Sequence, residues 1–169
     1  PLMVDMGLSF AQIGIYISML GAVAALIGAA LAGLLLRYLS RAQCLIVFSI
    51  VKIFSLAAYA ALAYGFAQQQ AVAEWLLYAV NAFEDACSAM LLVVMLTLIM
   101  QYSRKAYAGT DFTFQVSIMA TVSGVLYLCS GIMGDVLGYY PALNLICLIA
   151  ILCLAPIFYW QRQITSTAA

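Results

Sequence analysis

The chain has 169 residues, of which 68% are hydrophobic and 7% are charged, and its mean hydropathy is +1.15. A soluble domain carries about 25% charged residues, so the composition excludes an ordinary soluble protein and predicts one that lies within lipid. Six basic and six acidic residues cancel, and no basic cluster is dense enough to follow a nucleic-acid backbone. Nucleic acid is therefore excluded as an expected partner.

Histidine is absent, which removes a histidine-based triad, a histidine-containing zinc site and an imidazole pH switch. The five cysteines lie within apolar stretches and form no CxxC pair, so we interpret them as small hydrophobic residues. No nucleophilic side chain and general base occur at a sequence spacing that indicates a catalytic pair. We expect neither an enzyme nor a metal or other cofactor.

Five apolar stretches reach the length of about 20 residues that a helix needs to cross a bilayer. Short polar connections join them and leave no room for a soluble domain, so the predicted fold is an all-α membrane bundle. Residues 1–12 are expected to form an external loop, 13–160 the bundle and 161–169 a cytoplasmic tail. The predicted spans are 13–36, 42–66, 75–100, 114–134 and 142–160.

The charges of the connections predict the orientation, because basic residues concentrate on the cytoplasmic side of a membrane. Successive connections alternate sides, and one side collects Arg37, Arg41, Arg104, Lys105 and Arg162. The other side holds Asp5, Glu74 and Asp135. We therefore expect a multi-pass protein of the inner membrane with its C-terminus in the cytoplasm. An odd number of spans that begins outside without a leader leads us to expect further helices upstream.

Small residues recur every four positions in two of the predicted spans, an arrangement that lets helices approach closely. We interpret these stripes as packing faces. They are Gly21, Ala25, Ala29 and Gly33 in the first span, and Ser130, Gly134 and Gly138 in the fourth.

Three ionisable residues lie near the predicted midplane, where each costs about 2.5–3.5 kcal/mol on insertion scales. Lys52 lies in the second span, and Glu84 and Asp85 lie at matching depth in the third. Asn81 and Ser88 complete a polar stripe on that span, because the four positions follow the i, i+3, i+4, i+7 pattern.

One ammonium neutralises only one carboxylate. We expect Lys52 to form a structural ion pair with Glu84 or Asp85, because an unpaired buried ammonium costs more than the pair. The second acid either shares the hydrogen bonds of that pair or serves as a proton or substrate site. Two adjacent carboxylates repel each other when both are ionised, so the second acid is expected to hold a proton part of the time or to face water.

Residues 33–43 read GLLLRYLSRAQ and connect the first two predicted spans. They resemble the Gly-x-x-x-Asp-Arg-x-Gly-Arg-Arg loop of the major facilitator superfamily, with Gly33 and Arg41 matching. The chain differs from that loop at Arg37, Tyr38, Ser40 and Ala42. The superfamily has this loop between helices 2 and 3 and between helices 8 and 9. The resemblance implies helices 8–12 of a transporter, with the N-terminal helices of the same chain as partners.

Residues 108–117, AGTDFTFQVS, are similar to the siderophore-importer branch of that superfamily, which is related to muropeptide permeases and acetyl-CoA transporters. In the superfamily, helix 9 is peripheral and helices 10 and 11 line the cavity. This implies that the cavity or gate residues are Asn81, Ser88, Asp111, Gln115 and Tyr127. The alternatives are that Asp111 caps its helix and interacts with the helix dipole, and that Tyr127 and Asn144 serve packing and capping.

The expected function is therefore secondary active transport, with proton-coupled import of a small organic solute such as a siderophore. Glu84 and Asp85 are the candidates for proton coupling. The alternatives are a permease of the muropeptide or acetyl-CoA type and a non-transporting membrane scaffold.

Overall fold

The computed structural model describes residues 9–69 and 73–167, which contain helices and no strands. The all-α fold predicted from composition is confirmed, with five helical spans long and apolar enough to cross a membrane. These spans are Ile13–Leu35, Arg41–Ala67, Glu74–Tyr102, Lys105–Leu137 and Tyr139–Gln163. The predicted external loop lies largely outside the described residues, as does Asp5.

Two of the spans are single helices, α4 (Arg41–Ala67) and α5 (Glu74–Tyr102). The other three are composite. The first joins the π-helix η1 (Ile13–Ile17) and α3 (Ser18–Leu35), and the short helix α2 (Phe10–Gln12) precedes it. The fourth joins the 3₁₀ turn η2 (Lys105–Tyr107) and α6 (Ala108–Leu137). The fifth lies on α7 (Tyr139–Leu152) and α8 (Leu154–Thr167).

Two helical segments differ from the apolar runs of the sequence. The helical segment that contains the predicted span 114–134 begins at Lys105, because Asp111 binds back to Arg104 and holds the polar first turn in helical form. The fifth span is broken at Cys153. Pro156 causes this break, since it has no N–H and its ring clashes with the carbonyl four residues earlier.

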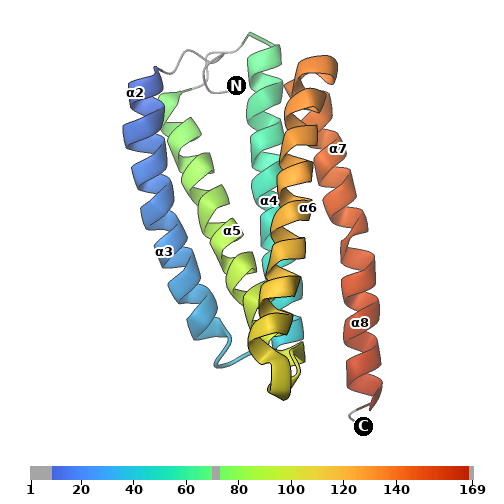
Figure 1. The fold of residues 1–169 in the computed structure, drawn as a ribbon. Coiled ribbons are helices and arrows are strands. Elements are labelled where there is room, and N and C mark those ends of the chain that lie inside the picture. Colours follow the sequence, from blue (N-terminus) through green and yellow to red (C-terminus); the bar gives the residue numbers. More distant parts are fainter. Residues whose placement is uncertain (1–8, 70–72, 168–169) are drawn as a thin grey trace.

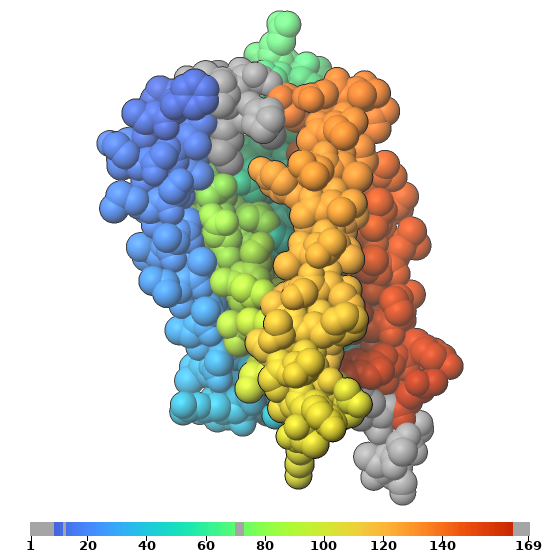
Figure 2. Space-filling model, viewed as in Figure 1, coloured from blue at the N-terminus to red at the C-terminus, as the bar shows by residue number. Residues whose placement is uncertain are grey.

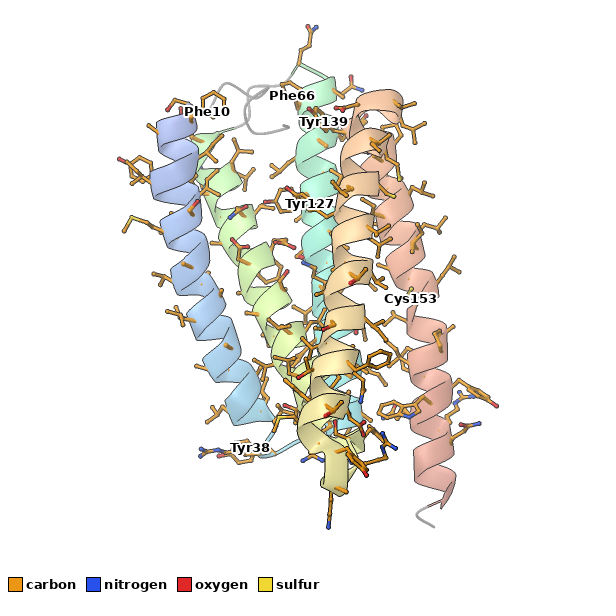
Figure 3. All side chains as sticks on the ribbon, viewed as in Figure 1. Phe10, Tyr38, Phe66, Tyr127, Tyr139 and Cys153 are labelled. Atoms are coloured by element: carbon orange, nitrogen blue, oxygen red, sulfur yellow. The ribbon has the colours of Figure 1, made fainter. Side chains whose placement is uncertain are left out.

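The connections alternate between the two ends of the bundle, as Figure 1 shows. In Figure 3, Tyr38 marks one end, and Phe66 and Tyr139 mark the other. The end near Tyr38, here called the basic end, collects every described Arg and Lys except Lys52. The opposite end carries Glu74 and Asp135. The charge separation predicted from the sequence is therefore present along the axis of the bundle.

The helices form a row in which α3 packs on α5, α5 on α4, and α4 on α7. Helix α6 lies across the front of this row and contacts α5 and α7 (Figure 2). It has no buried residue. The core nearest the basic end includes Cys44 and Phe48 of α4 and Val94 of α5, and a second cluster near the other end joins Ile17, Leu62 and Leu77.

The contact between α3 and α5 is the most extensive in the described chain. The buried residues of α3 are Gly21, Gly28 and Ala32, and the two glycines lie against Asp85 and Ala86 of α5. The predicted stripe was therefore wrong at Gly33, which is exposed with nothing within 4 Å of an added Cβ. A four-residue repeat drifts by about 40° per step on a helix of 3.6 residues per turn, whereas steps of seven and four keep their direction within about 20°.

Gly28 is the closest approach of the two backbones, because a Cβ there would overlap the carbonyl of Ala86 and lie 2.9 Å from its Cα. Backbone atoms cannot turn aside as a side chain can. We predict that Gly28→Ala forces α3 away from α5 and lowers both the yield and the melting temperature of detergent-solubilised protein.

Gly33→Ala is the matched control, because it adds the same methyl group to the same helix in open space. Alanine is favoured over glycine in a helix by up to about 1 kcal/mol, so this variant should melt at the same or a higher temperature. Equal melting of the two variants in a fluorescence-detected size-exclusion assay would contradict the close contact.

Candidate functional site

Of the three ionisable residues predicted near the midplane, Lys52 and Glu84 meet between α4 and α5, and Asp85 faces α3. Lys52 Nζ of α4 binds Glu84 Oε1 of α5 and also donates to Ser88 Oγ. Ser88 Oγ in turn donates to Glu84 Oε1 at 3.1 Å. The ammonium is thus held by one carboxylate and one hydroxyl. Lys52 and Glu84 keep 20% and 24% of their side-chain surface exposed, so the pair is largely enclosed.

Asp85 lies in a different environment from its neighbour Glu84. Its Oδ2 accepts a hydrogen bond from Asn81 Nδ2 at 2.8 Å, and Asn81 Oδ1 accepts one from the Tyr59 hydroxyl at 2.7 Å. Asp85 makes no ion pair with any described residue. The Asn81 amide therefore connects this carboxylate to a phenol on α4 rather than to a cation.

Asp85 also faces α3, where Gly21 makes room for it. A Cβ at Gly21 would overlap Asp85 Oδ2 and lie 3.1 Å from its Cγ. The carboxylate therefore lies directly against the backbone of α3. Glu84 and Asp85 are adjacent in sequence but about 100° apart around the helix, which is why one contacts α4 and the other α3.

Asp111 does not join this cluster and instead fixes the turn between α5 and α6. Its carboxylate accepts hydrogen bonds from the backbone N–H of Arg104 at 3.0 Å, from Nε at 2.9 Å and from Nη2 at 2.8 Å. The side-chain hydrogen bonds raise the pKa of the Arg104 guanidinium. The guanidinium also lies 5.3 Å from the ring centroid of Tyr107. This geometry supports a structural role for Asp111.

The remaining predicted cavity residues are dispersed. Gln115 lines an apolar groove at the basic end. Tyr127 is 78% exposed and projects from α6 (Figure 3), and it lines a cleft of about 500 Å³ that also reaches Tyr59. Asn144 donates to the carbonyl of Tyr140 at 2.9 Å, a bond within its own helix.

The loop that resembles the superfamily motif forms the turn between α3 and α4. Arg37 and Arg41 are exposed and form no ion pair with a described residue. Ser40, at the second glycine position of the motif, caps α4. Its hydroxyl accepts from the backbone of Gln43 at 3.3 Å, and Gln43 Oε1 accepts from the backbone of Ser40 at 3.0 Å. The loop therefore serves here as a helix start.

Three structural features described above were not predicted from the sequence. Tyr59 was not singled out, because a tyrosine in an apolar span usually signals packing. The Ser40–Gln43 capping box is readable, since Ser-x-x-Gln before an apolar run is a recognised helix start. The part that Gly21 plays in accommodating Asp85 leaves no local signal, because it depends on how α3 packs on α5.

No group of three described histidine, cysteine, aspartate or glutamate residues has the geometry to hold a metal ion. Near the middle of the bundle, the described polar side chains form two adjacent hydrogen-bonded sets, Lys52–Glu84–Ser88 and Tyr59–Asn81–Asp85. No protein-family model matches the chain, and no solved structure matches it.

The geometry of the ion pair predicts how α4 and α5 respond to loss of one partner. Lys52→Met leaves Glu84 without its cation, and breaking a buried pair costs about 3–5 kcal/mol; the partial exposure of both groups places the effect at the lower end. We expect less folded protein on size exclusion and a lower melting temperature.

The double variant Lys52→Met with Glu84→Gln removes both charges and should recover most of the loss, because no uncompensated charge remains. Lys52→Met with Asp85→Asn is the control and should not recover. Equal recovery by the two double variants would contradict the assignment of Glu84 as the partner.

Proposed function

We propose that these five helices belong to a proton-coupled secondary transporter that imports a small organic solute such as a siderophore across the inner membrane. Support comes from the sequence resemblance to the major facilitator superfamily and from the polar cluster between α3, α4 and α5. The main observation behind the proposal is that the two adjacent acids, Glu84 and Asp85, have different bonding partners. Glu84 is paired with Lys52, whereas Asp85 has a neutral hydrogen-bond donor and makes no ion pair with a described residue.

This division assigns a different task to each acid. The pairing of Glu84 keeps charge balanced between α4 and α5 and stabilises their packing. Asp85 has the chemistry of a proton carrier, because a carboxyl group enclosed without a cation can be neutralised by taking up a proton. The Asn81 side-chain amide can bind both the ionised and the protonated form of Asp85. Its NH₂ group donates to the carboxylate, and its carbonyl oxygen can accept from the protonated acid.

In this proposal, transport proceeds by alternating access, in which two halves of a longer chain rock about a site near the midplane. Asp85 takes up its proton when one side is open and releases it when the other side is open. Since Asp85 lies against Gly21, α3 has to move relative to α5 in each cycle. The cleft that contains Tyr59 and Tyr127 lies next to the same network and is the place where solute binding is sensed.

The proposed orientation places the basic end in the cytoplasm. Cysteines introduced at Ser40 and Gln69 lie at opposite ends of α4, in a variant whose native cysteines are replaced. A membrane-impermeant maleimide added to intact cells should label the cysteine at position 69 and leave the one at position 40 unlabelled. Labelling of position 40 from outside, with position 69 protected, would reverse the assignment.

The proposed function is tested by Asp85→Asn in the complete transporter. The amide has the size of the acid but cannot release a proton, so uphill solute uptake and its dependence on pH should be lost. Exchange of labelled for unlabelled solute requires no net proton movement and should persist. Uptake into proteoliposomes, with and without an imposed proton gradient, measures both activities.

Glu84→Gln serves as the matched comparison, because it changes the neighbouring acid in the same way. It should reduce the amount of folded protein more than Asp85→Asn does, while the protein that folds still accumulates solute. If both variants kept uphill uptake and its pH dependence at normal expression, both acids would be structural. A scaffold protein, the alternative function, would show no solute movement in any variant.

A further inference from the structure

The basic end of the bundle contains a groove that the proposed transport mechanism does not use. It has a volume of about 600 Å³ and lies between the α3–α4 turn with the start of α4, the end of α5 and the middle of α8. The polar side chains along it are Ser40, Arg41, Gln43, Gln101, Tyr102 and Gln161. One guanidinium and three amides give this groove several hydrogen-bond donors at the level where the helices end.

A second groove of about 450 Å³ continues from the first toward the middle of the bundle. The two share Leu98, Tyr102 and Trp160. Apart from Gln115, the other lining residues of the second groove are apolar, among them Leu45, Met95 and Ile157. The combined surface changes from polar to apolar with depth, as the two parts of a phospholipid do.

The aromatic pair lies where the two grooves meet. The rings of Tyr102 and Trp160 are 6.3 Å apart between centroids and are packed edge to face. Such amphipathic rings favour the level of the lipid headgroups and glycerol. Their position indicates that the polar groove lies at headgroup level and the apolar groove at the level of the acyl chains.

The charge around the groove selects the kind of headgroup. The basic end carries Arg37, Arg41, Arg104, Lys105 and Arg162 against one described acid, Asp111, which already binds Arg104. Arg41 is exposed and has no ion-pair partner among the described residues. An anionic phosphate group would satisfy it, whereas the cation of a zwitterionic headgroup would find no described carboxylate free beside it.

We propose that this pair of grooves binds one anionic phospholipid, with its phosphate at Arg41 and an acyl chain along Leu45, Met95 and Ile157. The lipid fills the space between α4, α5 and α8 and ties α8 to the bundle. The site takes its lipid from the surrounding leaflet and does not depend on the transport function.

The test is native mass spectrometry of the purified protein titrated with dioleoyl phosphatidylglycerol or with dioleoyl phosphatidylcholine. One phosphatidylglycerol should remain bound at activation energies that remove phosphatidylcholine, and it should raise the melting temperature more. Inorganic phosphate alone should do neither, because it lacks the chain that the apolar groove holds.

Two variants and one control locate the site. Arg41→Gln should weaken phosphatidylglycerol binding about fivefold or more, in line with about 1 kcal/mol for each basic residue near an anionic surface. Ile157→Trp should also weaken it, by filling the apolar groove. Arg37→Gln removes the same charge from the same end at a residue outside both grooves and should leave binding unchanged.

Equal binding of the two lipids would overturn the proposal. Equal loss in Arg41→Gln and Arg37→Gln would show a diffuse surface-charge effect instead of a site, and full binding by Ile157→Trp would overturn the placement of the acyl chain. If no lipid bound and Arg41 were protected from a guanidine-directed reagent, a protein segment would occupy the groove and the proposal would be wrong.

Discussion

Charge neutralisation between α4 and α5 is the interaction on which this arrangement depends. An unpaired ammonium in the middle of an apolar span is strongly destabilising, so Lys52 has to meet an acid. That requirement fixes the facing sides of the two helices and brings Glu84 and Ser88 toward α4. The same rotation turns Asp85 toward α3, where only a residue without a side chain leaves room for it. The ion pair and the glycine face of α3 are thus two parts of one constraint.

Hydropathy predicted the five spans well because a membrane-crossing helix requires mainly sufficient length and apolar character, almost irrespective of the exact sequence. Hydropathy did not predict the helix break before Leu154, which is caused by Pro156. It also did not predict the early start of the helix that contains the fourth span, which the Arg104–Asp111 contact stabilises. Both signals are present in the sequence, but a search for apolar runs averages over them. A helix-capping analysis would have found Ser40 as well.

The sequence predicted the contact between Lys52 and an acid but not which acid it would be. Matching depth on antiparallel helices indicated that Lys52 would meet one of two acids. The choice between Glu84 and Asp85 depends on the rotation of α5 about its axis, and that rotation is set partly by packing against α3, which no local pattern reveals. Tyr59 could not be predicted for the same reason, because its hydroxyl joins the site only through a hydrogen bond to Asn81 on the neighbouring helix.

The contact between Gly28 and Ala86 has a mechanical consequence. A tilt of α3 on α5 would have its pivot at this contact, because the two backbones already touch there and leave no room for a closer approach. Gly21 lies seven residues away, a lever arm of about 10 Å at 1.5 Å per residue. A tilt of about 10° would therefore lift Gly21 by about 2 Å, comparable with the radius of a water molecule. Rocking of α3 by this small angle would therefore open or close the space beside the Asp85 carboxylate and change its access to water.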